Sequence, residues 1–178
     1  MSGDTNLCED VFIHHRQRGE TIRVWVSTGG AQSHDEIHSA SVSADGRYVV
    51  FDAYATTLVA GDTNGKMDIF LHDTHTGETT RISVSSTGDQ ANNHSRFPSV
   101  SADGRYVAFP SQASNLVVGD TDGSTDVFVH DRQSGETTVI APELNGNSPS
   151  ISADGRYVAF IVFTNYKLDV FIHDRQTG

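Results

Sequence analysis

The sequence has few of the residues that build disulfide frameworks, cysteine-based metal sites or membrane spans. Cys8 is the only cysteine among 178 residues, which excludes an intrachain disulfide and a cysteine-based zinc site. No apolar run approaches the roughly 18 residues of a membrane-spanning helix. Residues 1–6 have neither the cationic start nor the apolar segment of a signal peptide. We therefore expect no membrane insertion and a fold that depends on packing and hydrogen bonds.

Positive charge is also scarce. Twelve Lys and Arg stand against 23 Asp and Glu, so the net charge is −11, and no run of basic residues occurs. Nucleic acids and anionic membranes bind proteins mainly through clustered cations, so both are excluded as expected partners. Hydrophobic residues make up 36% of the chain, which is enough for a folded core.

What the chain does contain is repeats. The motif Ser-Ala-Asp-Gly-Arg-Tyr-Val begins at Ser43, Ser101 and Ser152. A second motif, Asp-[Val/Ile]-Phe-[Val/Ile/Leu]-His, begins at Asp10, Asp68, Asp126 and Asp169, with spacings of 58, 58 and 43 residues. A third, Gly-Glu-Thr, begins at Gly19, Gly77 and Gly135. A period of about 40 to 60 residues indicates propeller blades or a solenoid.

One unit reads as four short antiparallel strands, which we call a, b, c and d in chain order. Residues 97–101 and 105–109 flank an Asp-Gly turn, residues 126–131 form an apolar strand, and residues 136–140 form a β-branched strand. No segment has a helical period. The sequence thus predicts an all-β protein, a β-propeller of four-stranded antiparallel blades with about three blades per chain. A β-sandwich is the alternative, but it gives a sequence no reason to repeat.

The repeats also resemble a known family. Residues 97–109, Phe-Pro-Ser-Val-Ser-Ala-Asp-Gly-Arg-Tyr-Val-Ala-Phe, followed by Asp-Val-Phe-Val-His-Asp at 126–131, resemble the WD-like repeat of TolB-type β-propellers. The family's usual Ser-Pro-Asp-Gly is Ser-Ala-Asp-Gly in all three copies here. The resemblance implies the propeller fold and a periplasmic or secreted location. It implies no single function, because such propellers serve as interaction scaffolds, peptidase accessory domains and polysaccharide-processing modules.

The repeats divide the chain into a half blade (1–37), two blades (38–86 and 95–141) and an incomplete blade (147–178). Strand c occurs four times and the other strands three times, so the order is c-d, a-b-c-d, a-b-c-d, a-b-c. A propeller needs at least about four blades to close. We therefore expect a homodimer with a six-bladed ring, in which strand d at residues 21–27 completes the last blade of the other chain. The alternative is a piece of a longer propeller, and the repeats do not decide which copy of strand c is displaced.

The loop between strands b and c carries a D-x-[DN]-G-x-x-D pattern. Its polar members are Asp62, Asn64 and Asp68 in one unit and Asp120, Asp122 and Asp126 in the next. Oxygen ligands around a Gly turn suit calcium, whereas Asp and Asn before Gly are also what a tight turn prefers. Calcium is therefore the one candidate cofactor, and the turn interpretation is favoured over it.

The remaining candidates favour structural roles. His14, His72, His130 and His173 occupy one repeat position, and blade spacing prevents them from sharing a metal ion, so we expect each to bond within its own blade. Asp45, Asp103 and Asp154 lie in the a–b turns, where repetition favours turn formation over catalysis. Trp25 stands where other units have Ser83 or Ala141, and we expect an edge or interface residue.

No nucleophile elbow or phosphate-binding loop occurs, so the sequence predicts no enzyme. The leading hypothesis is a non-catalytic binding or scaffold module that contacts a partner through propeller loops or the central channel. A glycan-binding propeller is the second hypothesis, with residues 90–94, Gln-Ala-Asn-Asn-His, as the polar loop. A lyase or hydrolase subunit on this fold is the weakest.

Overall fold

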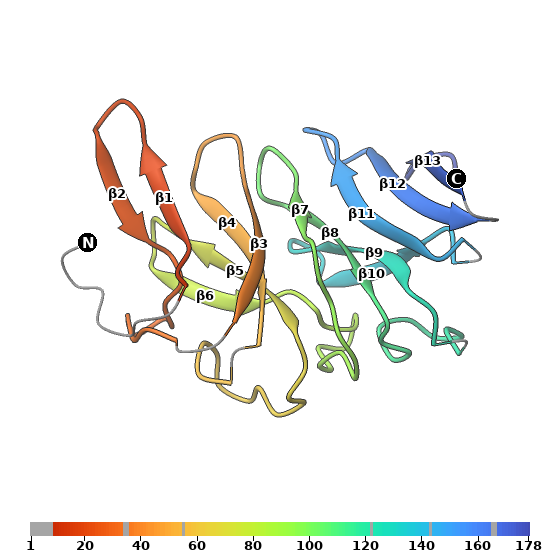
Figure 1. The fold of residues 1–178 in the computed structure, drawn as a ribbon, viewed down its shortest axis with the longest axis horizontal. Coiled ribbons are helices and arrows are strands. Elements are labelled where there is room, and N and C mark those ends of the chain that lie inside the picture. Colours follow the sequence, from red (N-terminus) through yellow and green to blue (C-terminus); the bar gives the residue numbers. More distant parts are fainter. Residues whose placement is uncertain (1–8, 34–35, 55, 122, 143, 165–166) are drawn as a thin grey trace.

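The protein consists of four antiparallel β-sheets that follow one another along the chain (Figure 1). The structure is a computed structural model, and it describes residues 9–33, 36–54, 56–121, 123–142, 144–164 and 167–178. No helix occurs among these residues, so none is available that could cross a membrane. The all-β fold expected from the repeats is confirmed.

The strand order agrees with the order read from the repeats. The first sheet has two strands, β1 (Phe12–His15) and β2 (Glu20–Arg23). The second is complete, with β3 (Ile37–Val42), β4 (Tyr48–Ala53), β5 (Asp68–Asp73) and β6 (Glu78–Arg81). The third is also complete, with β7 (Ser99–Val100), β8 (Tyr106–Ser111), β9 (Asp126–Asp131) and β10 (Glu136–Ile140). The fourth has three strands, β11 (Gly146–Ile151), β12 (Tyr157–Thr164) and β13 (Lys167–Asp174).

The core lies between neighbouring sheets rather than inside any one of them. Every residue of β5 and β9 is buried, because each of these strands c has a blade on both sides. The Phe70 ring of β5 faces the N-terminal sheet through Phe51 and Trp25, whereas Ile69 and Leu71 face the following sheet. This explains why strand c is apolar at consecutive positions.

The Ser-Ala-Asp-Gly-Arg-Tyr motif builds both a turn and a joint between sheets. Asp45 Oδ1 accepts hydrogen bonds from Ser43 Oγ (2.6 Å) and Arg47 N (3.0 Å), which closes the a–b turn. The same bonds recur in the turns at Asp103 and Asp154. Between sheets, Ala44 N donates to Ala102 O, and Ala102 N donates to Ala153 O, each at 3.0 Å. One sequence motif therefore stacks one blade on the next.

Glycine in the turn is required by the tyrosine of the preceding blade. Gly104 has φ +73°, and a Cβ there would collide with the ring of Tyr48. Gly155 has φ +72°, and a Cβ there would collide with the ring of Tyr106. Each tyrosine thus lies directly over the turn of the next blade.

Trp25 differs from its expected role at an edge or interface. Its side chain is 0% exposed and contacts Phe51 edge-on, with ring centroids 5.2 Å apart. The other two units have Ser83 and Ala141 at this position. The large ring packs in the core cluster with Val24, Phe51 and Phe70, so Trp25 is a core residue.

Candidate functional site

The acidic residues of the first b–c loop form a hydrogen-bonded network. Asp68 is buried and accepts bonds from Ser83 Oγ (2.5 Å), Asn64 Nδ2 (2.9 Å) and Gln90 Nε2 (3.1 Å). Gln90 Nε2 also donates to Asp62 Oδ1 at 2.9 Å. Burial raises the pKa of the Asp68 carboxyl, and these hydrogen bonds oppose the shift.

A cationic side chain already lies between the two carboxylates. Arg81 Nη2 is 3.8 Å from Asp62 Oδ2, and Arg81 Nε is 3.9 Å from Asp68 Oδ2. Asn64 Oδ1 accepts from Lys66 N at 2.7 Å, which is a turn bond. Its amide oxygen thus closes the turn, and Arg81 supplies the positive charge that a calcium ion would bring.

In the second b–c loop, Asp120 and Asp126 lie among the described residues, whereas Asp122 lies outside them. Asp126 is buried at the start of β9. Among the residues that the structure describes, no three His, Cys, Asp or Glu side chains are close enough to hold a metal ion.

Three of the four repeated histidines bond within their own blades, as expected. The Nδ1 atoms of His14, His72 and His130 lie 2.8–2.9 Å from the Oγ1 atoms of Thr21, Thr79 and Thr137. Thr79 Oγ1 donates to Val26 O of the neighbouring sheet (2.7 Å), so His72 Nδ1 must be the donor to Thr79. Burial lowers the pKa of His72 and His130, which favours the neutral ring.

The a–b turn carboxylates also have structural roles. The hydrogen bond from Ser43 is the main cause that lowers the pKa of Asp45, and Ser101 does the same for Asp103. Arg105, two residues after Asp103, donates two hydrogen bonds to Asp131, with Nε–Oδ1 at 2.9 Å and Nη2–Oδ2 at 2.7 Å. These groups are engaged in holding the turn to strand c.

A small pocket lies between the third and fourth sheets, beside the segment that leads into β7 and the end of β8. Its volume is about 160 Å³, and His94, Arg96, Phe97, Gln112, Thr125 and Asn147 are among the residues that line it. Phe97 is 41% exposed although it is a large aromatic side chain. An exposed aromatic ring beside a guanidinium is typical of a contact site for another molecule.

The backbone of Phe97 is in the left-handed region, with φ +48°. This conformation is an outlier for a bulky residue and costs about 1–3 kcal/mol. The repeats place Ser39 and Ser148 at the same position, and Ser148 also has φ +48°. The conformation therefore recurs before strand a of the fourth sheet but not at Ser39 of the second, whereas the phenyl ring is particular to this blade.

A buried carboxylate holds this segment in place. Asp52 is 0% exposed, and it accepts from Phe97 N (2.8 Å, Oδ2) and from Ser39 N (2.7 Å, Oδ1). The other units have Pro110 and Ile161 at its position, so Asp52 is not part of the repeat. Phe97 and Asp52 each depart from the repeat, as the aligned units show. Only the structure shows that the two residues are hydrogen-bonded to each other.

His94 presents a neutral ring to the pocket. Its Nδ1 accepts from Met67 N at 3.1 Å, and the ring contacts Tyr54 edge-on. Burial, followed by the charges of Arg96 and Lys66, lowers the pKa of His94. The pocket therefore combines an apolar ring, a neutral imidazole, an amide and one guanidinium.

The polar loop considered for glycans is bonded mainly to the protein itself. Asn92 N donates to Asn115 Oδ1 at 2.9 Å, and Asn92 Nδ2 donates to Ser114 Oγ at 3.0 Å. Asn115 Nδ2 in turn donates to Gln90 O at 2.8 Å. Ala91 is buried. These bonds tie the loop to its neighbour in the following blade.

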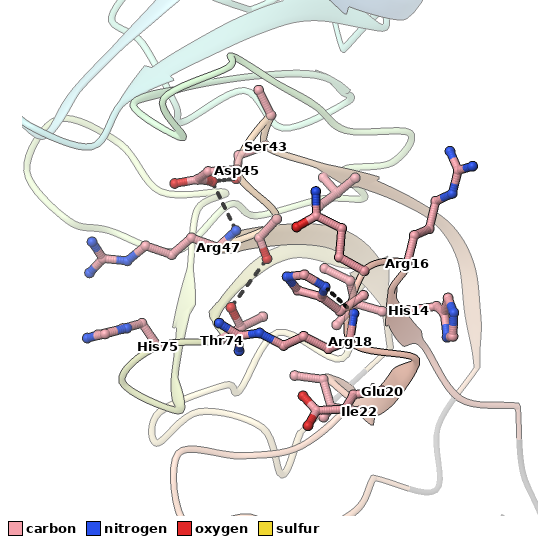
Figure 2. A pocket seen from close by; sticks show the side chains of 16 residues that line it. His14, Arg16, Arg18, Glu20, Ile22, Ser43, Asp45, Arg47, Thr74 and His75 are labelled. Atoms are coloured by element: carbon pink, nitrogen blue, oxygen red, sulfur yellow. Dashed lines mark hydrogen bonds between the residues drawn. The ribbon is translucent and has the colours of Figure 1, made fainter.

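A larger groove of about 660 Å³ lies at the other end of the protein, beside the N-terminal hairpin. Its lining includes Arg16, Arg18 and Glu20 from the hairpin and Asp45, Arg47 and His75 from the second sheet (Figure 2). Arg47 is bound to Asp73 (Nη2–Oδ2 2.8 Å). Ile13 and Gly46 also line this groove. Among the described residues the first sheet contains strands c and d but no strand a or b.

Neither a protein-family model nor a curated protein matches the chain. Solved structures do match. TolB from Acinetobacter baumannii superimposes with a TM-score of 0.61 at 20% sequence identity, over 99% of this chain and 38% of that chain. The β-propeller domain of the Trilobed protease from Pyrococcus furiosus, described as having an open velcro topology, has a TM-score of 0.52 at 16% identity, over 80% of this chain and 40% of that chain.

A prolyl endopeptidase structure also matches, with a TM-score of 0.58 at 16% identity, over 93% of this chain and 24% of that chain. The chain thus spans two-fifths or less of the length of these three structures. At such identities the likeness concerns the fold, and the matched proteins have different activities. Sheet order, blade joints and superposition agree: the chain has the fold of a TolB-type β-propeller.

Proposed function

We propose that the protein is a non-catalytic binding module that contacts a protein partner at the pocket around Phe97. The observation that carries this proposal is the Phe97 ring, 41% exposed on a backbone with φ +48°. At this exposure a phenylalanine leaves about two-fifths of its surface in water, and its backbone is strained. The equivalent positions have serine, Ser39 and Ser148, so the fold does not require the ring. A partner that covers the ring gives it a role.

The chemistry of the pocket fits a polypeptide. Aromatic residues and Arg are enriched where protein interfaces are most strongly bound, and Phe97 and Arg96 are adjacent here. The neutral His94 and the Gln112 amide add directional hydrogen bonds without a second charge. One guanidinium beside an apolar ring suits an apolar side chain followed by a carboxylate or carbonyl.

The scaffold is suited to rigid presentation of this pocket. Phe97 is anchored through its N–H to Asp52 of the preceding sheet, and Pro110 and Gln112 flank it at the end of β8. A segment that is already held by hydrogen bonds loses little conformational entropy on binding, which favours affinity. Among the described residues, each repeated His–Thr pair is used in blade packing, which supports binding without chemistry of the module's own.

The test is a selection from a random peptide library against the wild-type protein, with counter-selection against the Phe97→Ser variant. This variant carries the residue found at the same position in two other units, so its stability should equal or exceed that of the wild type. We expect peptides whose affinity falls at least about tenfold in Phe97→Ser, as for a truncated interface anchor. Val118→Ser, in a fully exposed loop residue, is the matched control and should bind as the wild type does.

The proposal is wrong if every selected peptide binds Phe97→Ser as well as it binds the wild type. A glycan array separates the alternative: glycans that bind the wild type and are lost in Phe97→Ser would identify a lectin instead.

A further inference from the structure

The joint between the second and third sheets contains a carboxylate that the next joint lacks. Asp52, in strand b of the second sheet, accepts hydrogen bonds from Ser39 N (2.7 Å) and from Phe97 N (2.8 Å) of the following sheet. Pro110 has the same register position in strand b of the third sheet. A proline side chain has no acceptor atom, so the joint that follows is built without this carboxylate.

The pocket around Phe97 lies at the joint where the carboxylate is missing. Pro110 is one of its lining residues, and so is Asn147, from strand a of the fourth sheet. In the fourth sheet, Ser148 has the repeat position of Phe97, and its N–H donates to Asn147 Oδ1 at 2.8 Å instead of to a carboxylate of the preceding sheet. The pocket therefore occupies the joint position that corresponds to the Asp52 site one blade earlier.

The described residues that line this pocket offer hydrogen-bond donors and no carboxylate. None of them is Asp or Glu, although the chain has 23 of these residues against 12 Lys and Arg. Among the described residues, none forms an ion pair with the Arg96 guanidinium. His94 Nδ1 accepts from Met67 N, so the neutral ring carries its proton on Nε2. Asn147 Oδ1 accepts from Ser148 N, which leaves Nδ2 as a donor. One cation among several donors is complementary to an anion.

The size of the pocket and the Phe97 ring favour the carboxylate of a chain terminus. The volume is about 160 Å³, below the roughly 300–1,000 Å³ of sites for drug-sized ligands, so the pocket holds one residue rather than a peptide segment. A C-terminal residue carries a carboxylate and a side chain on the same Cα atom. It can therefore place its carboxylate at Arg96 and an apolar side chain on the Phe97 ring, whereas an internal Asp or Glu offers the carboxylate alone.

We propose that this pocket binds the C-terminal carboxylate of a partner polypeptide whose last side chain is apolar, with Arg96 on the carboxylate and Phe97 on the side chain. The bound carboxylate is the acceptor between the third and fourth sheets that Asp52 is between the second and third. This inference rests on the proposed function, because it specifies the partner chemistry of the same pocket.

The net charge of the protein adds selectivity. At −11, the chain repels polyacidic partners, and a C-terminus brings a single negative charge to the one guanidinium that lines the pocket among the described residues. The expected partner is therefore apolar at its terminus and carries few other acidic residues.

The first test compares free and amidated C-termini. Peptides with a randomised free C-terminus on a Gly-Ser linker are selected on the wild-type protein, and the selected sequences are synthesised as free acids and as C-terminal amides. We expect amidation to lower the affinity at least about tenfold, because it removes the charge that Arg96 binds. Amides that bind as well as the acids, and still require Phe97, overturn this inference and leave the proposed function standing.

Dependence on Phe97 separates the two claims. If every selected peptide binds Phe97→Ser as well as it binds the wild type, the proposed function fails and this inference fails with it. Amidated peptides with an internal Asp or Glu that bind as tightly as the free acids would identify a side-chain carboxylate as the occupant, which also overturns the C-terminal assignment.

The second test supplies the missing carboxylate from within the chain. Pro110→Asp introduces the residue that the second sheet has at this position, and it should weaken binding of the free-acid peptides at least about tenfold by occupying the site. Pro110→Asn is the matched control, because asparagine has the same shape without the charge, and it should bind these peptides more tightly than Pro110→Asp does. Equal affinities of the two variants overturn the proposal.

The third test removes the cation. Arg96 is exposed, so Arg96→Gln should leave the fold intact. We expect this variant to bind the free acids at least about tenfold more weakly than the wild type does and to bind the amides with unchanged affinity. A loss that is equal for acids and amides would show that Arg96 does not act on the carboxylate, and it would overturn the proposal.

Discussion

The joint between blades predicts that two turn glycines with the same backbone conformation respond differently to alanine. Gly104 has φ +73° and Gly135 has φ +76°, so both substitutions carry the cost of a left-handed L-residue, about 1–2 kcal/mol. Nothing lies within 4 Å of a Cβ built at Gly135, whereas one at Gly104 collides with the Tyr48 ring. The difference between the two variants in the free energy of unfolding therefore measures the contact between Gly104 and the Tyr48 ring.

Tyr48 cannot readily move away from an added methyl group. Its ring centroid lies 4.8 Å from the Arg47 guanidinium carbon and 4.4 Å from that of Arg132. Overpacking a close contact costs about 1–3 kcal/mol. We therefore expect Gly135→Ala to lower the free energy of unfolding by about 1–2 kcal/mol and Gly104→Ala to lower it by about 2–5 kcal/mol.

The measurement is urea unfolding at fixed protein concentration, checked by thermal melts, in which each kcal/mol corresponds to about 2–4 °C for a chain of this size. In a Tyr48→Ala background, the cost of Gly104→Ala should fall to that of Gly135→Ala, because the collision is removed. Equal costs of the two glycine variants in the wild-type background would refute the account of the joint.

Three further expectations follow from single contacts. The Arg47 guanidinium is the main cause that lowers the pKa of Asp73 from 3.8 to about 2, so the stability from this pair is complete above pH 3.8 and is lost as the pH falls toward 2. Arg47→Gln should thus be less stable than the wild type at neutral pH, with a difference that shrinks over that window in urea unfolding; a pH-independent difference would contradict it. Because Arg81 lies between Asp62 and Asp68, the melting temperature in millimolar calcium should stay within about 2 °C of its value with chelator. Calcium at 100 times the Kd of a real site would raise the free energy of unfolding by about 2.7 kcal/mol and would contradict this expectation. Asp52→Leu should destabilise the protein more than Asp52→Asn in the same unfolding assay. Asparagine retains one acceptor oxygen, whereas leucine leaves the N–H groups of Ser39 and Phe97 without an acceptor, each at a cost of about 1–3 kcal/mol. Equal losses of stability in the two variants would show that these bonds contribute little.

The repeated motifs were enough to predict the architecture of this protein. Residues that repeat make the same local contacts in each copy of the turn, so the Ser-Ala-Asp-Gly-Arg turn and strand c could be predicted from one unit and applied to the others. Turn chemistry and apolar patterning are local properties, and local properties are readable from a sequence.

The candidate site was decided by residues that depart from the repeat. Phe97 and Asp52 are 45 residues apart and come from different blades, and nothing local predicts that the carboxylate bonds the Phe97 N–H. The prediction that Trp25 is an edge or interface residue was wrong for the same reason. Its burial depends on packing against Phe51 and Phe70 of the second sheet, which the sequence does not show.

The first and last sheets show the same division. Counting strands in the sequence predicted a surplus strand c, because strand number follows from the motifs. Only the tertiary structure showed that β13 has the longer ladder and the Arg156–Asp174 pair, whereas β1 has four residue pairs. The number of strands is a local property, but the free energy that holds each strand depends on neighbours that the fold brings from elsewhere in the chain.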